Sequence, residues 1–575
     1  MSARKKRWIV RDPAPPSFLT AQGDRAPLVA SLLHQRGLQS PAAIDAFFST
    51  DHRSGLHDPF LLHGMDAAVV RIAAAIAAGE QIAVYGDFDT DGVTAVALLT
   101  QAIRAMGGEI TPYIPHRIRE GYGLNTEAID QLVAGGTTLL ITVDCGISNT
   151  AEVAHAQAHG LDVIVTDHHT PPATLPPALA LINPKQPGCA YPYKDLVGVG
   201  IAYKLVVALV RRGQKMSHGG EVRGRDLLDL VALGTVADMG PLTGENRVLV
   251  RVGIDALNTT NRPGVRALIA AAGLTQGKVT ASDIGYTLGP RLNAAGRIDD
   301  ALHAYQLLLA EDLAAARLIA DELNRLNRER QMLSTDIQRI ARERIAEQGL
   351  ADARIIVLED PQFPPGVIGL IASRLVDEFG RPVVLLAPDG DMARGSARSI
   401  PDFSMIAALT SASELFRRFG GHAAAAGFSI SRENIAPLTT RLQQYAEEHL
   451  ADELLAPPLM IDAEVPFTAL DTTLHDALLA LEPFGQANTQ PLLQTSHVHV
   501  ADARTVGADN AHLKLRLDAG DGGATIDAIA FRLGNLAPYF VRHPWIDVVY
   551  ALELDTWNGK RTLRLNIKDL RRAQA

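Results

Sequence analysis

Short apolar segments alternate with segments of helical length between residues 81 and 166. The apolar segments are 81–85, 109–114, 138–143 and 161–166. Helices are predicted at 93–106, 126–133 and 150–159. Strands that alternate with helices in this way indicate a parallel α/β sheet. The loops that follow such strands are the usual ligand site of the fold, so we expect chemistry-bearing residues there.

One long helix is predicted between residues 311 and 349, because no glycine or proline interrupts residues 311–348. Its apolar residues recur at near-heptad spacing: Ile319, Leu323, Leu326, Leu333, Ile337 and Ile340. The other faces carry Arg325, Arg328, Arg330, Arg339, Arg342 and Arg344. Two compatible interpretations remain open: a solvated connector between domains, and a basic helix that lines a nucleic-acid path.

The remaining segments complete a four-part chain preceded by an extension. Segments 354–358, 367–379 and 383–387 restart an α/β pattern, and five short alternating runs after Pro457–Pro458 indicate a small β-barrel. The predicted domains are a helical extension at 1–60, a first α/β domain at 61–310, the long helix at 311–350, a second α/β domain at 351–455 and the barrel at 457–575.

Composition narrows the classes of protein. The 575 residues include 54 Lys+Arg and 64 Asp+Glu, a net charge of −10, which argues against a general duplex-coating protein but leaves room for a local basic groove. Cys145 and Cys189 are too few for a disulfide framework or a four-thiolate metal site. The N-terminal residues show no secretory pattern, and no run of 18 apolar residues occurs. A cytoplasmic protein with no membrane contact is expected.

An acidic cluster, YGDFDTDG, follows the first predicted strand. Asp87, Asp89 and Asp91 alternate within it, and carboxylates at this density repel one another unless a cation neutralises them. A calcium-binding EF-hand loop would need Glu at its twelfth position, where this chain has Leu98. A metal site is favoured, and a solvent-exposed acidic turn is the alternative.

Three further segments place polar residues after apolar ones. Asp144 follows the third predicted strand, Asp167–His169 follows the fourth, and Asp238 follows an apolar helical run. Side chains of adjacent residues point in opposite directions on an extended chain, so one of the two histidines is expected to be a ligand and the other to face substrate or support the site. Cys145 is interpreted as a structural cysteine.

Taken together, these residues offer oxygen ligands and one imidazole, which suit manganese or magnesium better than structural zinc. Two such ions, about 3.5–4 Å apart and bridged by a carboxylate, are a common device for phosphoester hydrolysis. The ions lower the pKa of a bound water and stabilise negative charge in the transition state.

The order DFDTDG, VDCG, DHH and GTVAD resembles the four motifs of the DHH phosphoesterases. Further on, GPRLNAAGRIDDA, PPGVIGLIASRL, GSARS and FGGHAAAAG resemble the RecJ family of that superfamily, and LEPFGQAN extends the likeness into the last domain. The resemblance implies a DHH domain with a parallel sheet, a long connecting helix, an α/β DHH-associated (DHHA1) domain and a C-terminal OB-fold β-barrel. It also implies a 5′→3′ exonuclease for single-stranded DNA, acting in DNA repair and recombination.

The resemblance implies the following metal ligands, for two ions of Mn²⁺ or Mg²⁺. Asp89 and Asp144 would hold one ion, and Asp144 would be shared. The second ion would take Asp91, Asp144, His168 and Asp238. Asp87 would lie beside them as a ligand or through water, and His169 would approach the scissile phosphate; these last two are the expected catalytic residues.

The resemblance also implies nucleic-acid contacts. The residues expected to hold DNA phosphates, including the 5′ end, are Arg117, Arg297, Ser396 and Arg398, with Gly420, Gly421 and His422 beside them. Each arginine taken alone could equally be a solvated side chain. The GGH segment could be a turn, or could offer amide groups to an anion if it faces a helix start.

The barrel strands carry Lys514, Arg516, Lys560, Arg561 and Arg564, which suit a platform for a single strand, although a purely structural barrel is the alternative. The chain departs from the family pattern at Pro364, where His is common, and at Ala487 and Thr489, where Gly and Pro are expected. These departures leave the metal ligands complete and bear on DNA contacts near the second domain.

Two other functions remain as alternatives. One is a DHH-family phosphodiesterase for short oligonucleotides or cyclic dinucleotides, although such chains are commonly shorter and lack the barrel. The other is a non-catalytic DHH replication scaffold, which loss of metal ligands would favour. The expected partners are single-stranded DNA and, as candidates, a single-strand-binding protein and a helicase. A monomer is expected.

Overall fold

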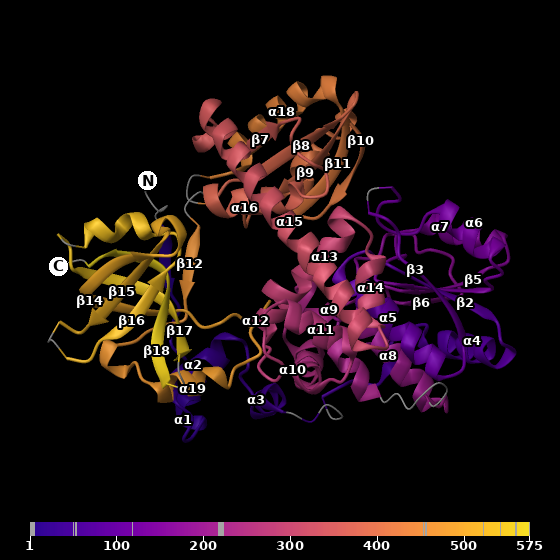
Figure 1. Cartoon of the computed structure of the whole chain (residues 1–575), viewed down its shortest axis with the longest axis horizontal. Coiled ribbons are helices and arrows are strands. Elements are labelled where there is room, and N and C mark those ends of the chain that lie inside the picture. Colours follow the sequence, from indigo (N-terminus) through magenta and orange to yellow (C-terminus); the bar gives the residue numbers. More distant parts are fainter. Residues whose placement is uncertain are drawn as a thin grey trace. The chain divides into compact units, whose positions relative to one another are not determined.

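The computed structural model of the chain describes residues 6–49, 51, 55–117, 119–216, 224–451, 454, 457–520, 523–540, 542–557 and 560–573 (Figure 1). It forms two compact units. The larger unit comprises residues 50–455 with 485–487, and the smaller one comprises residues 1–49, 456–484 and 488–575.

The larger unit begins with a five-stranded parallel sheet in the order β3-β2-β4-β5-β6. Its strands are β2 (Gln81–Gly86), β3 (Glu109–Tyr113), β4 (Leu139–Val143), β5 (Asp162–Thr166) and β6 (Ala180–Ile182). The α/β fold class with a parallel sheet is confirmed. The edge strand β6 was not predicted, because three residues are too few to show a periodicity.

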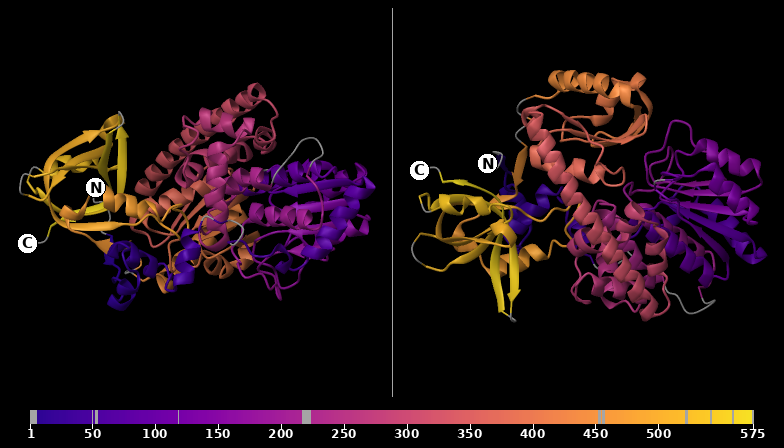
Figure 2. Two further views of the ribbon diagram at one scale, coloured as in Figure 1. Left: turned by 90° about the horizontal axis from the view of Figure 1, so that it is seen from below. Right: turned by 45° about the horizontal axis from the view of Figure 1, so that its top comes forward.

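Helices cover both faces of this sheet (Figures 1 and 2). The helices on one face are α4 (Met65–Ala78), α5 (Thr90–Ala105) and α8 (Gly198–Arg211), and those on the other are α6 (Thr126–Ala134) and α7 (Thr150–Ala158). Alternate strand residues feed the two cores: Ile82 and Val84 pack in the first, Ala83 and Tyr85 in the second. This double cover explains the nearly continuous apolar strands.

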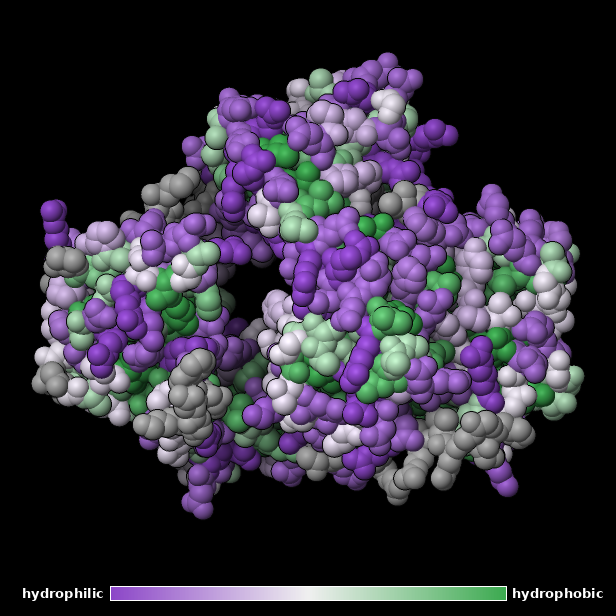
Figure 3. Space-filling view, in the orientation of Figure 1, coloured by the Kyte–Doolittle hydropathy of each residue, from purple (hydrophilic) through white to green (hydrophobic). Residues whose placement is uncertain are grey.

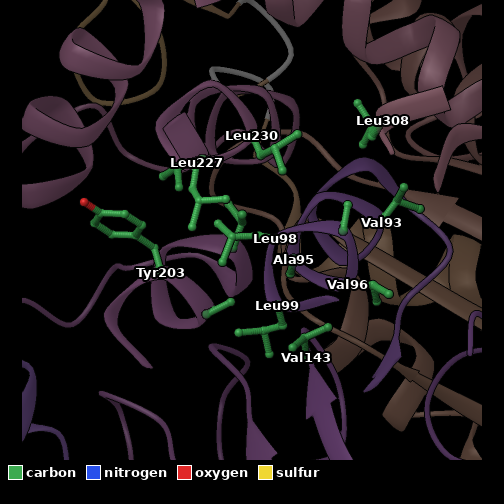
Figure 4. Close-up of a cluster of buried hydrophobic side chains, with 14 of the residues drawn as sticks. Val93, Ala95, Val96, Leu98, Leu99, Val143, Tyr203, Leu227, Leu230 and Leu308 are labelled. Carbon is green, nitrogen blue, oxygen red and sulfur yellow. The ribbon is translucent and has the colours of Figure 1, made fainter. Parts of the chain in front are cut away.

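A helical layer extends the first core beyond the sheet. It contains α9 (Leu228–Ala237), α10 (Gly244–Thr259), α11 (Pro263–Ala271), α13 (Gly289–Ile298) and α14 (Leu302–Leu308). Figure 4 shows where α5 meets this layer: Leu98 and Leu99 lie among side chains that include Tyr203 and Leu230. The buried contact fixes the start of α5, which carries part of the acidic cluster.

The long helix is α15 (Leu313–Glu347). Leu323 and Leu326 in its first half pack into the core of the parallel sheet, whereas Ile337 and Ile345 in its second half pack into a core with the next domain. The apolar stripe is therefore buried at both ends, and α15 is an integral part of two cores rather than a solvated connector.

The domain after α15 has a mixed sheet in the order β10-β11-β9-β8-β7. Its strands are β7 (Ile356–Glu359), β8 (Val383–Asp389), β9 (Met392–Arg398), β10 (Phe416–Gly421) and β11 (Ala425–Ser431); its helices are α16 (Ile368–Phe379), α17 (Met405–Thr410) and α18 (Ile435–His449). Only β7 and β8 are parallel, and the other pairs are antiparallel.

The smaller unit contains a closed barrel, because β14 pairs with both β15 and β17. The barrel strands are β14 (Leu493–Val506), β15 (His512–Asp518), β16 (Ile526–Ala530), β17 (Trp545–Trp557) and β18 (Lys560–Arg572), and Figure 2 shows how they curve around a common interior. The predicted five-stranded barrel is confirmed.

The N-terminal segment belongs to the barrel unit. It contains α1 (Pro16–Ala21), α2 (Pro27–Gln35) and α3 (Pro41–Phe48), and also strand β1 (Arg7–Val10), which pairs in parallel with β12 (Pro458–Ile461). Leu32 and Leu33 of α2 are buried in the barrel core. The expectation of a purely helical extension was therefore incomplete, because the pairing partner of β1 lies some 450 residues away in the sequence.

The molecular surface in the view of Figure 3 is mainly hydrophilic, with small apolar patches. Among the described helices, none combines the length and the apolar composition that a membrane span requires.

Candidate metal centre and phosphate-binding residues

The polar residues singled out from the sequence meet at the carboxyl edge of the parallel sheet. Asp87 and Asp89 follow β2, Asp144 follows β4, and Asp167–His169 follow β5. These three strands are neighbours in the order β2-β4-β5. Asp238 ends α9, whose side chains pack against α5 in the same core. The sheet topology and the packing of α9 against α5 thus bring together residues that are up to 151 positions apart, from Asp87 to Asp238.

The loop after β2 is shaped by its own carboxylates and by a glycine. Asp89 is the N-cap of α5, and its Oδ1 accepts hydrogen bonds from the backbone N–H groups of Asp91 and Gly92, at 2.9 and 3.2 Å. A Cβ on Gly92 would lie 2.5 Å from the carbonyl oxygen of Asp87. The final glycine of DFDTDG is therefore required for the loop to pack against the first turn of α5.

The carboxylate of Asp91 is held by the N-terminus of α8. Its Oδ2 accepts from the backbone N–H of Gly198 at 2.7 Å, and its Oδ1 accepts from that of Val199 at 2.8 Å. A Cβ on Gly198 would lie 2.6 Å from the Cβ of Asp144 and 2.9 Å from Asp91 Oδ2. Gly198 thus allows the helix start to approach two acidic residues at once.

The loop after β4 holds Asp144 in a left-handed conformation, with φ at +60°. Asp is one of the few residues that tolerate this region. The loop is fixed by the hydroxyl of Thr142, which donates to the carbonyl of Cys145 at 2.8 Å, and by Gly146, where φ is +107°. Cys145 is fully buried in the second core, as the structural interpretation of this cysteine predicted.

His168 faces the carboxylates. Its Nε2 lies 3.0 Å from Asp144 Oδ1, 3.8 Å from Asp238 Oδ2 and 4.0 Å from Asp91 Oδ2. Burial and the neighbouring His169 lower the pKa of His168 to about 3. The imidazole is therefore neutral at physiological pH, with the lone pair that a metal ligand needs.

His169 has a different environment. Its Nδ1 lies 2.8 Å from Asp167 Oδ1 and 3.1 Å from the hydroxyl of Tyr122. Burial lowers its pKa, but the hydrogen bond to Asp167 and the charge of that carboxylate outweigh burial, so the pKa of His169 is raised. His169 is therefore the histidine of the pair that carries a proton more readily.

The expectation that the two histidines point in opposite directions is wrong. Their ring centroids are 4.4 Å apart, and nitrogens of both rings lie within 4.0 Å of Asp144 Oδ1. Strand β5 ends at Thr166, so residues 167–169 do not follow the alternation of an extended strand.

Three overlapping groups of side chains have the spacing of metal ligands. They are Asp87, Asp89 and Asp144; Asp91, His168 and Asp238; and Asp144, His168 and His169. Within each group the ligand atoms lie within 4.8 Å of one another. The first two groups share no residue, and the 3.0 Å approach of Asp144 to His168 joins them.

The donor set fits divalent cations. Asp87 Oδ1, Asp144 Oδ1 and His168 Nε2 are buried atoms without a hydrogen-bond partner. Burial and neighbouring carboxylates raise the pKa values of Asp87, Asp91 and Asp144 well above their ordinary range, and raise that of Asp238 to about 7. Buried acids with unsatisfied oxygens are stabilised by a bound cation, and this arrangement does not fit an exposed acidic turn.

Two of the expected phosphate-binding arginines lie beside this centre. The guanidinium of Arg117 stacks on the ring of Phe88, 3.8 Å from its centroid. Burial and the charge of Arg297 lower the pKa of Arg117 to about 10, and the charges of Asp87 and Asp89 oppose this shift. Arg117 and Arg297 are therefore close enough to repel each other next to the acidic cluster.

Ser396 and Arg398 share one face of β9. Arg398 Nη1 donates to Ser396 Oγ at 3.2 Å and to the carbonyl of Ala397 at 2.8 Å. A Cβ on Gly369, at the start of α16, would lie 2.9 Å from both Ser396 Oγ and Arg398 Nη2. Burial and the charge of Arg297 lower the pKa of Arg398. Arg297 belongs to the first domain, so Arg398 lies close enough to that domain for the two positive charges to repel each other.

Gly420 lies in the same cross-strand row as Ser396, because both pair with Gly427 of β11. Gly420 and Gly421 end strand β10, and His422 begins the turn to β11, with its N–H donating to the carbonyl of Ala425 at 2.8 Å. The GGH segment is thus part of a hairpin and not the N-terminus of a helix. The space that a Cβ on Gly420 would occupy is open.

The barrel cations are balanced by carboxylates. Lys514 lies 2.8 Å from Asp527, Arg561 lies 2.7 Å from Asp476, and Arg564 lies 2.9 Å from Glu553. Arg516 also lies near Asp527, at 3.9 Å, and the side chain of Lys560 lies outside the described residues. These ion pairs leave less free positive charge for a strand than the sequence suggested.

Sequence reasoning missed several residues of the site. They are Tyr122, Lys185, Gly198 and Val199, and Asp167 was singled out without a role of its own. Lys185 Nζ donates to the carbonyl of His168 at 2.7 Å. Tyr122 donates to the carbonyl of Asp144 at 3.2 Å. Asp167 lies in the DHH segment and Tyr122 in the GYG segment, so the sequence offered a signal for these two residues. The hydrogen bond from Gly198 to Asp91 joins residues 107 positions apart, and no local sequence pattern could have predicted it.

Models of three protein families match the chain. The DHH family, N-terminal domain, matches residues 81–235; the DHHA1 domain matches 352–448; and the RecJ OB domain matches 461–569. The fold and the site thus define a DHH phosphoesterase.

Curated relatives match nearly the whole chain. Single-stranded-DNA-specific exonuclease RecJ of Bacillus subtilis is 37% identical over 99% of this chain and 71% of its own length, and that of Escherichia coli is 36% identical over 95% and 96%. Structures of RecJ from Thermus thermophilus in complex with Mn²⁺ and with Mg²⁺ match 99% of this chain and 80% and 79% of theirs. Their TM-scores are 0.83 and 0.76, at 32% and 30% identity. The chain belongs to the RecJ family.

Proposed function

We propose that the chain is an exonuclease that hydrolyses phosphodiester bonds of single-stranded DNA from the 5′ end, with two ions of Mn²⁺ or Mg²⁺. One observation carries the proposal: two separate ligand groups, Asp87–Asp89–Asp144 and Asp91–His168–Asp238, meet at the 3.0 Å contact of Asp144 with His168. The names of the full-length relatives and the ions in the solved RecJ structures support it.

We assign the ligands as follows. Asp89 and Asp144 would hold one ion, with Asp87 beside them, and Asp91, Asp144, His168 and Asp238 would hold the other. Two such ions, when bound, supply an activated water and stabilise negative charge on the phosphate. Backbone N–H groups of Gly198 and Val199 hold the carboxylate of Asp91, and Asp89 is held as the cap of α5, so these two carboxylates are already positioned by the protein.

His169 is assigned to the substrate. Its Nδ1 is engaged by Asp167, which leaves Nε2 for an oxygen of the scissile phosphate. The raised pKa of His169 suits a group that donates a hydrogen bond or proton to that oxygen. Tyr122, with a half-exposed side chain, contacts both His169 and the Asp144 loop and positions the imidazole.

The proposed direction of degradation rests on the residues that we assign to the 5′ end. The guanidinium of Arg398 can donate two parallel hydrogen bonds to phosphate oxygens, and the neighbouring hydroxyl of Ser396 is a further donor. Gly420, which lies in the same cross-strand row as Ser396, has no side chain to fill the space beside them. We assign these residues, with Gly421 and His422, to the 5′ end of the strand, and Arg117 and Arg297 to the phosphates that follow.

The expected setting also belongs to the proposal. We place the enzyme in the cytoplasm as a monomer that acts in DNA repair and recombination. A single-strand-binding protein and a helicase are its candidate protein partners. The alternative substrates, short oligonucleotides or cyclic dinucleotides, are not favoured, because the chain carries a complete barrel domain and its relatives over the full length are named for single-stranded DNA.

The test uses matched strands labelled at the 5′ or the 3′ end, together with blunt duplex and RNA. With Mn²⁺ or Mg²⁺, single-stranded DNA should release 5′ label at once as short products while the 3′-labelled strand shortens progressively. EDTA should stop the reaction. Release of 3′ label first, or equal cleavage of duplex, would contradict the proposal.

A further inference from the structure

One arginine of helix α15 differs from the others. Four of its arginines form ion pairs with carboxylates: Arg325 with Glu322 and Glu329, Arg339 with Glu343, Arg342 with Glu378, and Arg344 with Glu347 and Asp360. Arg317 and Arg328 are exposed to solvent. Arg330 is buried, with 8% of its surface exposed.

The charge of Arg330 has no compensating carboxylate in the described part of the chain. Its Nη2 donates to Asn327 Oδ1 at 2.9 Å, and its Nε is buried without a partner. No ion pair with a described acidic residue is formed. Burying a guanidinium that has only one neutral hydrogen-bond partner costs folding free energy, unless a bound anion neutralises its charge.

Polar residues share the face of α15 that carries Arg330. Asn324, Asn327, Arg330 and Ser334 follow one another at steps of three, three and four, and all are buried. The hydroxyl of Ser334 also has no partner. Asn324 accepts from Arg291 of α13 at 3.1 Å, so this polar face lies toward the helix that carries Arg297. Two unsatisfied donors therefore lie one helical turn apart.

The surroundings of Arg330 are positive. Burial and the charges of Arg297, Arg374 and Arg291 lower its pKa to about 10. The charge of Arg297 also lowers the pKa values of Arg117 and Arg398. Arg330 therefore belongs to the same positive region as the residues assigned to the strand, although it comes from a different helix.

We propose that Arg330 binds a phosphate of the DNA strand through its guanidinium group, whose charge no described carboxylate neutralises. The inference rests on the proposed function and selects one of the seven arginines of α15 as a contact to nucleic acid. The phosphate could be the 5′-terminal one or an internal one, because both offer the same oxygens. Comparing strands that carry a 5′-phosphate with strands that carry a 5′-hydroxyl distinguishes the two.

The experiment measures binding of a 3′-fluorescein oligothymidylate by anisotropy, in EDTA so that the strand is not cut, over a series of salt concentrations. The variant is Arg330→Met, and the matched control is Arg325→Met on the same helix, whose guanidinium is already paired. Both are measured with 5′-phosphate and 5′-hydroxyl strands. Thermal unfolding without DNA is recorded for each protein.

We expect Arg330→Met to weaken binding roughly ten- to a hundredfold. The slope of log affinity against log salt should become less steep by about 0.7, the value for one lost contact to a single strand. The melting temperature should be unchanged or higher, because an apolar side chain replaces an uncompensated buried charge. Arg325→Met should leave affinity and slope as in the wild type.

A larger loss with 5′-phosphate than with 5′-hydroxyl strands assigns Arg330 to the terminal phosphate, and an equal loss assigns it to an internal one. Wild-type affinity and slope for Arg330→Met on both strands would overturn the inference. If Arg330→Met does not fold, Arg330→Gln, which removes the charge but keeps a polar head, serves the same comparison. A wild-type protein that fails to bind single strands would instead contradict the proposed function.

Discussion

His168 Nε2 and Asp144 Oδ1 face each other at 3.0 Å, and neither atom has a hydrogen-bond partner. Asp144 also lies with Asp87 and Asp89, and His168 with Asp91 and Asp238, so this contact joins two potential ligand groups. A neutral imidazole and a buried carboxylate in this arrangement could both bind a cation.

Asp144→Ala should reduce the rate of hydrolysis more than about a hundredfold. Removing a residue that only supports a metal ligand already lowers metal affinity or activity about ten- to a hundredfold, and a direct ligand should matter more. Asp130→Ala is the matched control: Asp130 also pairs with a histidine, His155, at 2.7 Å, but on α6 and α7 away from the strand ends. Initial rates with Mn²⁺ check the prediction. Near-normal turnover by Asp144→Ala would remove Asp144 from the metal site.

Gly198→Ala should weaken Mn²⁺ binding about ten- to a hundredfold without unfolding the protein. The added methyl would lie 2.6 Å from the Cβ of Asp144 and 2.9 Å from Asp91 Oδ2, so both carboxylates must move. Gly200→Ala on the same helix meets only Leu196, at 3.3 Å, and should bind Mn²⁺ normally. Calorimetric titration distinguishes them; equal affinities would show that the helix start does not position the ligands.

Binding of Mn²⁺ at pH 7 should release protons. Burial and the charge of Asp89 raise the pKa of Asp238 to about 7, so in the metal-free protein this carboxyl is protonated below that pH and ionised above it. A cation binds the ionised form, so affinity should fall as the pH is lowered through 7. Titration heats should therefore depend on the ionisation enthalpy of the buffer. Identical heats in phosphate and Tris would contradict the raised pKa.

Arg398→Ala should weaken binding of 5′-phosphorylated strands roughly ten- to a hundredfold, and should weaken 5′-hydroxyl strands much less. Arg394 on the same strand is exposed and lies 3.6 Å from Asp389, so Arg394→Ala is the control. If Arg398→Ala costs the same factor on both kinds of strand, Arg398 does not contact the terminal phosphate. Mn²⁺ affinity should be unchanged in both variants.

Local patterns predicted the parts of the fold in which neighbours in sequence are neighbours in space. The apolar run before Asp87 gave β2, and the run before Asp144 gave β4, so the carboxyl-edge cluster could be predicted without coordinates. The near-heptad stripe gave α15, although not the fact that its apolar face is shared between two cores.

Contacts between distant segments could not be predicted. The pairing of Trp8 in β1 with Leu459 in β12, and the hydrogen bonds from α8 to Asp91, join residues whose local sequences are ordinary. Periodicity also gave equal weight to the six arginines that the sequence analysis named in this helix. Only tertiary packing separates the buried Arg330 from Arg325, which carboxylates neutralise. The histidine pair was misjudged because the strand ends one residue before Asp167.

The central claim is that Asp144 is shared by two divalent ions, and anomalous diffraction from crystals grown with Mn²⁺ tests it most directly. Two anomalous peaks about 3.5–4 Å apart are expected, each with a carboxylate oxygen of Asp144 bound to it. One ion should also contact Asp89, and the other His168 and Asp238. A single peak, or manganese bound only at the surface group Asp130, His155 and His159, would contradict the account.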